Sequence, residues 1–347
     1  MTILITGGAG FIGSHFARLK VKQQEKVVVL DKLTYAGNLE NLDEITKDSN
    51  KLPYFKFHKG DICNKHLVEK IVKEEDVSVI VNFAADSHVD RSIMNADSFI
   101  DTDVKGTYTL LETAKENNVK RFIQISTDEV YGSIASGSFK ESDVLYPRNP
   151  YSASKAGAEM LANAYWVTHK VPVIIARSCN NYGPNQYPEK LLPLFITNAM
   201  EDKELPVYGD GKQIRDWLHV EDNCSAIDFL LENGKPGETY NISAGNECTN
   251  IEITNLILNE LKKPSSLIKH VKDRVGHDRR YSIDCSKIRS LGWEPNITFE
   301  DGIKSTIKWY ITNKDWWNKI KTGEFLKYYG KQYEERETKL SSYCLGS

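Results

Sequence analysis

Short apolar segments alternate with longer amphipathic ones through the first half of the chain. The apolar segments, which resemble strands, are residues 2–6, 27–31, 54–58, 77–83, 121–126 and 171–177. Residues 64–75 and 96–117 carry apolar side chains at helical spacing, and a strand-like segment follows each of them. This alternation predicts an α/β fold of the Rossmann type, with a doubly wound parallel sheet and right-handed helical crossovers.

The pattern changes after about Asn180. Shorter elements follow, interrupted by glycine and proline near residues 182–184, 208–211 and 235–237. We therefore predict a first domain over residues 1–179, a smaller lobe over 180–333 and a polar, poorly ordered tail over 334–347. Residues 220–232 have a helical pattern that can pack on the first domain, so some segments of the lobe are expected to return to it.

Composition places the 347 residues among ordinary globular proteins. Hydrophobic residues make up 40% and charged residues 27%, and no apolar stretch approaches the roughly 20 residues that cross a bilayer. The formal net charge of -3 gives no overall attraction to nucleic acid. The first strand-like segment begins directly after Met1, which leaves no signal peptide. We expect a cytoplasmic protein that binds neither membranes nor nucleic acid.

The cysteines are scattered, with no Cys-x-x-Cys pair and no histidine at metal-ligand spacing. They are Cys63, Cys179, Cys224, Cys248, Cys285 and Cys344. Neither a disulfide framework nor a metal site is predicted.

A glycine-rich turn joins the first strand to the first helix. Gly7, Gly10 and Gly13 have the spacing G-x-x-G-x-x-G, and the apolar helix 11–19 follows. Glycine lets the backbone approach a pyrophosphate, whose charge the helix N-terminus favours. A turn without a ligand is the alternative, but the strand–turn–helix context favours a dinucleotide site.

Acidic residues after the second and third strands refine this cofactor site. Asp31 stands where a carboxylate can accept hydrogen bonds from both adenosine ribose hydroxyls, and its charge would repel a 2′-phosphate. NAD is therefore preferred over NADP, with the reservation that Lys32 adds a positive charge nearby. Asp61 and Ile62 stand where an adenine-contacting pair is expected, although the dipeptide alone is weak evidence.

Tyr151 and Lys155 are four residues apart in a predicted helix and therefore share one face. A nearby ammonium favours a phenolate and lowers the phenol's pKa from its ordinary value of about 10. Tyr151 could then take a proton from a sugar hydroxyl while hydride leaves to NAD, and Lys155 could hold the nicotinamide ribose. The spacing is common in helices, but downstream of the glycine turn it indicates a catalytic pair.

Thr127, Asp128 and Glu129 directly follow the apolar strand 121–126. Open α/β sheets place their sites at the carboxyl ends of strands. Adjacent carboxyls can acquire different pKa values and so supply the acid and the base that a dehydration needs. The alternative is that Asp128 and Glu129 merely begin a polar loop.

Seven segments resemble the dTDP-glucose 4,6-dehydratases of the extended short-chain dehydrogenase/reductase family. They are residues 7–14, 31–38, 82–92, 126–132, 150–155, 180–184 and 273–280, which together extend over nearly the whole chain. The pairs Trp309-Tyr310 and Trp316-Trp317 are also similar to that family, although packing aromatics would explain them equally. The acidic pair after Thr127 is the discriminating feature, because related 4-epimerases and decarboxylases generally lack it.

The resemblance implies a reaction and roles for four residues. Members of this family convert dTDP-glucose to dTDP-4-keto-6-deoxyglucose and water by oxidation at C4, elimination across C5 and C6, and return of hydride to C6, which regenerates NAD. By resemblance, Thr127 contacts the 4-hydroxyl region, Asp128 is the acid at the C6 oxygen and Glu129 is the base at C5. Tyr151 is then the base at the 4-hydroxyl. A homodimer through helices 96–117 and 151–169 is also implied.

Motifs and resemblance together assign the ligand contacts. Around NAD they place Gly7, Gly10, Phe11, Ile12, Gly13, Asp31, Lys32, Leu33, Thr34, Asp61, Ile62, Ala84, Ala85, Ser87, Thr102, Tyr151, Lys155 and Asn181. Around the nucleotide sugar they place His88, Thr127, Asn180, Lys190, Leu191, Pro206, Val207, Tyr208, Arg215, Asn250, Asp273, Arg274 and His277. Arg215 and Arg274 suit a diphosphate because a guanidinium offers several donors.

Three positions depart from the family pattern. Asp86 stands where Glu is common, Asp103 where Asn is usual and Val275 where Pro is usual. None removes a catalytic group, but Asp103 could alter local electrostatics. The rival functions are a UDP-hexose 4-epimerase, a dehydratase that uses another nucleotide, and a catalytically silent NAD-binding sensor or scaffold.

Overall fold

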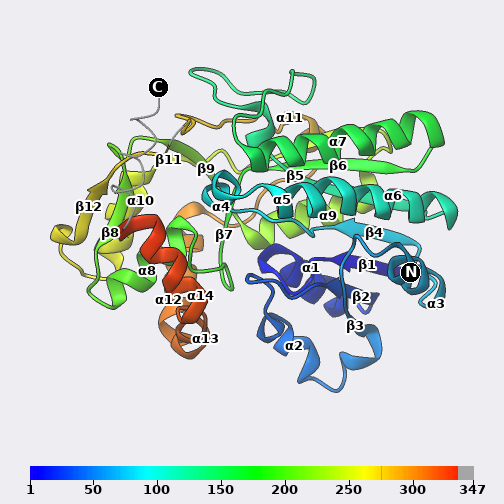
Figure 1. The fold of residues 1–347 in the computed structure, drawn as a ribbon, viewed down its shortest axis with the longest axis horizontal. Coiled ribbons are helices and arrows are strands. Elements are labelled where there is room, and N and C mark those ends of the chain that lie inside the picture. The colour runs from blue at the N-terminus through cyan, green and yellow to red at the C-terminus, as the bar shows by residue number, and fades with distance from the viewer. Residues whose placement is uncertain (275, 335–347) are drawn as a thin grey trace.

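The computed structural model describes residues 1–274 and 276–334, whose centre is a seven-stranded parallel sheet (Figure 1). Its strand order is β10-β6-β5-β4-β1-β2-β3. These strands are β1 (Thr2–Thr6), β2 (Lys26–Asp31), β3 (Phe55–Lys59), β4 (Val79–Asn82), β5 (Arg121–Thr127), β6 (Val173–Ser178) and β10 (Thr239–Ile242). All six predicted strands form, with ends moved by two residues or fewer. The predicted Rossmann-type sheet is therefore confirmed.

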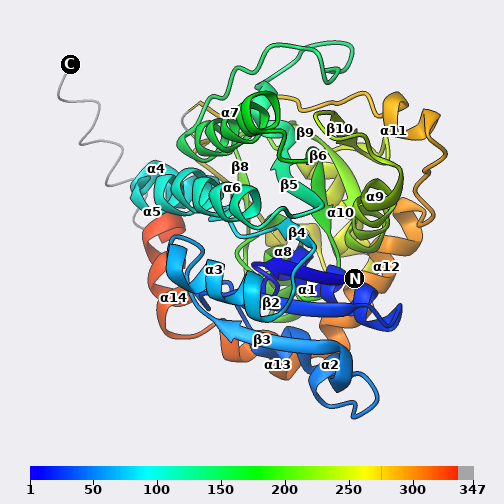
Figure 2. The same cartoon turned by 90° about the vertical axis from the view of Figure 1, so that its right-hand side faces the viewer.

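Helices cover both faces of this sheet, as Figure 2 shows. On one face lie α1 (Phe11–Lys22) and α9 (Val220–Asn233), and on the other lie α3 (Lys65–Glu74), α6 (Thr107–Glu116) and α7 (Pro150–His169). The strands read as continuous apolar runs because they are buried on both sides. Residues 220–242 belong to this layered part, since α9 packs against α1 and β10 pairs with β6. The division into two domains at residue 179 stays a prediction.

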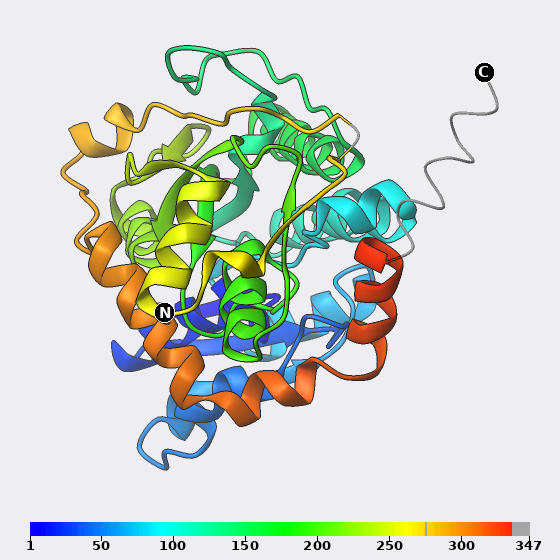
Figure 3. The same cartoon turned by 90° about the vertical axis from the view of Figure 1, so that its left-hand side faces the viewer.

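The other elements after β6 gather at one end of the sheet around a separate apolar core (Figure 3). Trp217, Tyr310, Trp316 and Trp317 are buried in this core. Its elements are β7 (Asn180–Tyr182), α8 (Leu191–Met200), β8 (Leu205–Tyr208), β9 (Ile214–His219), β11 (Glu247–Thr249), α10 (Asn250–Glu260), β12 (Ile268–Val271), α12 (Phe299–Thr312), α13 (Lys314–Ile320) and α14 (Gly323–Tyr329).

Short elements complete the chain. They are α2 (Asp43–Thr46), α4 (Val89–Met94), α5 (Asp97–Phe99), α11 (Ser286–Ser290), π-helical segments Ile100–Gly106 and Gly330–Glu334, and 3-10 turns Leu39–Leu42, Leu52–Tyr54, Asp128–Tyr131 and Ser265–Leu267. Val275, Cys344 and the predicted tail beyond residue 334 lie outside the described residues. Within residues 1–274 and 276–334, no helix combines the length and apolar character needed to cross a membrane.

Candidate active site

A tight glycine turn places the N-terminus of α1 at the carboxyl end of β1. Gly7 has φ +66°, and a Cβ on it would lie 2.7 Å from the backbone nitrogen of Ala84. A Cβ on Gly13 would lie 2.4 Å from the carbonyl oxygen of Gly7, so only glycine lets the helix approach this closely. Gly10 precedes α1, and no described side chain caps the helix there. The first N–H groups of α1 therefore fit the pyrophosphate of a dinucleotide.

A first cavity of about 230 Å³ extends from this turn along the carboxyl ends of the strands. All residues predicted around NAD line it except Leu33 and Asn181. The predicted residues in its lining are Gly7, Gly10, Phe11, Ile12, Gly13, Asp31, Lys32, Thr34, Asp61, Ile62, Ala84, Ala85, Ser87, Thr102, Tyr151 and Lys155. Leu33 instead donates its backbone N–H to Asp31, and Asn181 donates its side-chain amide to the carbonyl oxygen of Cys179.

Asp31 is buried at the end of β2 and fixes the turn around it. Its two oxygens accept hydrogen bonds from the backbone N–H groups of Ala9, at 2.9 Å, and Leu33, at 2.7 Å. Each carboxylate oxygen keeps a further lone pair for a ribose hydroxyl. Lys32 pairs with Asp61 at 2.7 Å, so its charge is already compensated. The earlier reservation about Lys32 is thereby weakened, and the site suits NAD.

Tyr151 and Lys155 project from the first turns of α7 into the first cavity, and both are almost fully buried. Burial raises the pKa of Tyr151 well above its ordinary value, and the carboxyls of Glu129 and Asp103 raise it further. Burial also lowers the pKa of Lys155. The expected fall in the pKa of Tyr151 is therefore wrong, because desolvation and the neighbouring carboxyls raise it, and the one opposing effect is the hydrogen bond with Thr127.

Thr127, Asp128 and Glu129 form a tight turn after β5. The Thr127 hydroxyl accepts a hydrogen bond from the backbone N–H of Glu129 at 3.2 Å. Asp128 is 3% exposed, and burial followed by repulsion from Glu129 raises its pKa to about 8. Glu129 is less buried, accepts a hydrogen bond from Asn149 at 3.2 Å and lies 3.5 Å from the Tyr281 hydroxyl. The two adjacent carboxyls thus differ, because Asp128 is protonated at neutral pH and Glu129 has polar neighbours.

A second cavity of about 140 Å³ lies between the sheet and the C-terminal core. All residues predicted around the nucleotide sugar line it except Thr127 and Asp273. The predicted residues in its lining are His88, Asn180, Lys190, Leu191, Pro206, Val207, Tyr208, Arg215, Asn250, Arg274 and His277. Glu129 also lines this cavity, and Glu189 and Lys190 line both cavities. A ligand that reached from one cavity to the other would pass these side chains.

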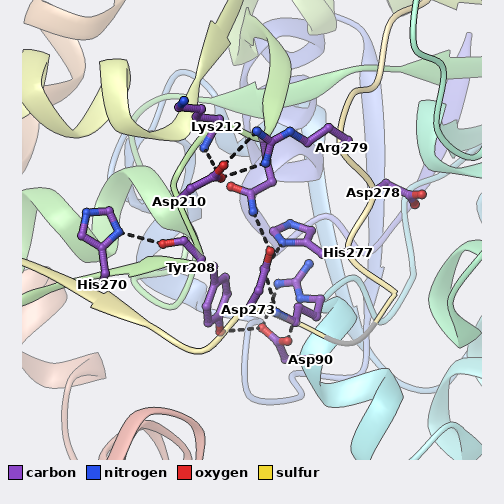
Figure 4. A network of polar contacts seen from close by, with 12 residues as sticks. Asp90, Tyr208, Asp210, Lys212, His270, Asp273, His277, Asp278 and Arg279 are labelled. Atoms are coloured by element: carbon purple, nitrogen blue, oxygen red, sulfur yellow. Dashed lines mark hydrogen bonds and ion pairs between the residues drawn. The ribbon is translucent and has the colours of Figure 1, made fainter.

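Ion pairs orient the basic side chains of the second cavity (Figure 4). Arg274 donates two hydrogen bonds of 2.8 Å to the two oxygens of Asp90, which also accepts a hydrogen bond from Tyr208 at 3.2 Å. Asp273 is not among the residues that line the cavity, and it contacts Nδ1 of His277 at 2.6 Å. Burial lowers the pKa of His277 to about 4, so the ring is neutral at pH 7.

Three residues that sequence reasoning left unassigned stand at the site. Asp90 holds Arg274, Glu189 lies between the cavities, and Tyr281 connects Glu129 to Asp278. Asp90 and Asp278 fall within the segments 82–92 and 273–280 that carried the resemblance. Tyr281 follows the latter segment directly. For Asp90 and Tyr281, their position in or beside these motifs was the available signal, whereas Glu189 lies outside the motifs. The partners Arg274 and Glu129 lie far away in the sequence.

Comparison with known proteins shows to which family the chain belongs. The sequence profile of the family described as GDP-mannose 4,6 dehydratase matches residues 4–306. The chain is 51% identical to the low-salt glycan biosynthesis protein Agl12 of Haloferax volcanii, over 90% of this chain and 99% of that protein. It is 47% identical to a dTDP-glucose 4,6-dehydratase of Actinoplanes sp., over 91% of this chain and all of that enzyme.

A solved structure gives the same picture. The crystal structure of DesIV, a dTDP-glucose 4,6-dehydratase from Streptomyces venezuelae with bound NAD, is 48% identical and superposes with a TM-score of 0.89, over 92% of this chain and 100% of DesIV. Fold and site define an NAD-dependent enzyme of the extended short-chain dehydrogenase/reductase class. Within that class, the chain belongs to the GDP-mannose 4,6-dehydratase family, together with the dTDP-glucose 4,6-dehydratases that it resembles.

Proposed function

We propose that this protein is a dTDP-glucose 4,6-dehydratase, which converts dTDP-glucose to dTDP-4-keto-6-deoxyglucose and water. One observation carries the proposal. Tyr151 and Lys155 line the first cavity, and Glu129 lines the second, with the protonated Asp128 beside it in the sequence. A base for oxidation therefore adjoins a base and an acid for elimination of water. Relatives with nearly full-length similarity carry this activity in their names.

The proposed roles follow from position. Bound NAD accepts hydride from C4 of the sugar and returns it to C6. Tyr151 takes the proton of the 4-hydroxyl, and Thr127, whose hydroxyl favours the ionised form of that phenol, supports it. Glu129 then removes the C5 proton, which the 4-ketone has made acidic. Asp128 gives its proton to the C6 oxygen as water leaves, and its raised pKa supports this role. When hydride returns to C6, Glu129 gives the proton back to C5, so that water is the only loss.

Substrate turnover tests the proposal directly. The purified protein is incubated separately with dTDP-glucose and UDP-glucose, and each product is followed by mass spectrometry. Loss of one water from dTDP-glucose alone is the expected result. An unchanged mass with altered sugar stereochemistry would establish a 4-epimerase instead. Loss of water from UDP-glucose would mean that the substrate carries UDP. No reaction with either sugar would favour the binding-protein alternative.

A second experiment separates oxidation from elimination. In Glu129→Gln, Tyr151 and Lys155 are intact, but the base for the C5 proton is absent. We expect dTDP-glucose to reduce the bound NAD, with NADH absorbance persisting and no water lost. Full turnover by this variant would contradict the assignment of Glu129 as the base.

A cytoplasmic homodimer through α6 and α7 completes the proposal. Tyr108, Met160 and Val167 are 47%, 53% and 58% exposed on these helices, which is high for apolar side chains. Tyr108→Glu combined with Met160→Glu should halve the mass measured by light scattering. Ile311→Glu, which alters an exposed apolar residue on α12, should leave that mass unchanged. Cell fractionation tests the location.

A further inference from the structure

Asp103 is a buried carboxyl that the proposed mechanism does not use. It lies in the π-helical segment Ile100–Gly106, which packs against α7, and is 1% exposed. Its Oδ2 accepts a hydrogen bond of 2.6 Å from the Ser154 hydroxyl. Its Oδ1 makes no side-chain hydrogen bond among the described residues, and the backbone N–H of Asp86 is the other donor beside the carboxyl. Burying a carboxyl with so few donors is costly, which indicates a role beyond packing.

Ser154 connects this carboxyl to the catalytic helix. The Ser154 hydroxyl lies 2.6 Å from Asp103 and 2.8 Å from the carbonyl oxygen of Tyr151. Ser154 directly precedes Lys155, which is 3% exposed. Asp103 is the first among the charges that raise the pKa of Lys155, ahead of Glu159, and it also raises the pKa of Tyr151. One negative charge therefore acts on both members of the catalytic pair.

The charge of Asp103 is itself titratable near neutral pH. Burial raises its pKa to about 7, although Lys155 and the hydrogen bond from Ser154 oppose the rise. The Asp86 carboxyl raises this pKa further, and the backbone N–H of Asp86 lowers it. Asp103 is therefore neutral in mild acid and negative above about pH 7.

We propose that Asp103 is a positioning residue that sets the pH range in which Tyr151 and Lys155 carry out the first oxidation. The inference rests on the proposed function. When Asp103 is negative, Tyr151 ionises only at higher pH, and Lys155 keeps its proton to higher pH. The acid limit and the alkaline limit of oxidation therefore both move upward.

Asp103→Asn removes the charge but keeps the side-chain size and an acceptor for Ser154. The test measures NADH formation from dTDP-glucose from about pH 6 to about pH 11 in the Glu129→Gln background, which stops after oxidation. We expect the limbs of the pH profile that fall in this range to move down by about one pH unit, the order of effect that one buried charge has on a nearby titrating group. Lower rates with unmoved limbs would make Asp103 a packing residue and overturn the proposal.

The matched control is Asp101→Asn, which removes an exposed carboxylate two residues away and should leave both limbs in place. Equal shifts in both variants would contradict a specific role for Asp103. If the Glu129→Gln parent forms no NADH, the assigned reaction has failed rather than this inference.

A readout without substrate is the unfolding temperature as a function of pH. The pKa of Asp103 is raised in the folded state, so its contribution to stability is present below about pH 4 and is lost as pH rises to about 7. Asp103→Asn should therefore gain stability relative to the natural chain over that interval. A difference that does not change with pH would show that Asp103 does not titrate as proposed.

Discussion

The two cavities of this protein are built in different ways. The first cavity is framed by the glycine turn, the N-terminus of α1 and residues just after the parallel strands. The second cavity depends on side chains that meet across the chain, and its Arg274–Asp90 pair joins residues 184 positions apart. Backbone geometry shapes the first, whereas tertiary ion pairs orient the second.

This difference separates two kinds of substitution. Changes in the first cavity should weaken NAD binding with little effect on the nucleotide sugar, and changes in the second should do the reverse. Tyr151 lines the first cavity and Glu129 the second, and the place between these two side chains, the junction, is where the reacting parts of both ligands meet in the proposed mechanism. Substitutions there should reduce the rate of chemistry and leave both binding steps nearly intact.

The largest expected effect is at that junction. Tyr151→Phe removes the phenol that takes the 4-hydroxyl proton, so NADH formation from dTDP-glucose should fall by about 10²- to 10⁴-fold in stopped-flow measurements. Tyr146→Phe removes a phenol that is 73% exposed and should react normally. NADH formation at the natural rate in Tyr151→Phe would remove Tyr151 from its proposed role.

Much of the first cavity could be predicted from the sequence, because its determinants are local. The turn at Gly7 to Gly13 and the carboxylate of Asp31 each follow a strand that apolar patterning reveals. Strand β10 was not predicted, since Thr239–Ile242 is only four residues long and alternates polar and apolar side chains instead of forming an apolar run. The raised pKa of Tyr151 was also missed, because spacing reports the nearby ammonium but not the desolvation.

The second cavity was predicted mainly through family resemblance. Spacing gives no reason for Asp90 to meet Arg274, or for Tyr281 to lie 3.5 Å from Glu129. These contacts arise only when the C-terminal lobe packs against the sheet. Asp273 was likewise misplaced, because its side chain contacts His277 and does not line the cavity.

The next effect tests the first cavity alone. Asp31→Asn places an amide NH₂ where a carboxylate oxygen now accepts a backbone N–H, and it loses an acceptor for the ribose. We expect NAD affinity, measured by calorimetry on cofactor-free protein, to fall by about 10- to 100-fold. Asp315→Asn, an exposed change on α13, is the control. A large change in the KM for dTDP-glucose at saturating NAD would show that the two cavities do not bind their ligands independently.

A smaller effect is expected in the second cavity. Arg274→Lys keeps the charge but loses the planar fork that pairs with Asp90, so the KM for dTDP-glucose should rise by about tenfold. NAD affinity should stay unchanged. Arg279→Lys is the matched control, because Arg279 makes a similar two-fold pair with Asp210 on the exposed surface. An equal rise in both variants would show that the Asp90 pair has no special role.

The smallest effect concerns stability at the junction. Burial raises the pKa of folded Asp128 to about 8, far above the value of about 3.9 expected in the unfolded chain. Below about pH 4 the group is protonated in both states. As pH rises towards 8 it ionises only in the unfolded chain, so its contribution to stability is progressively lost. Asp128→Asn does not titrate, and should gain free energy of unfolding relative to the natural chain as the pH rises from about 4 to about 8, while losing activity. Urea titrations at both pH values measure this gain. If the free energies of unfolding of Asp128→Asn and the natural chain differ by the same amount at both pH values, Asp128 is ionised in the folded protein. The elimination would then lack its proposed acid.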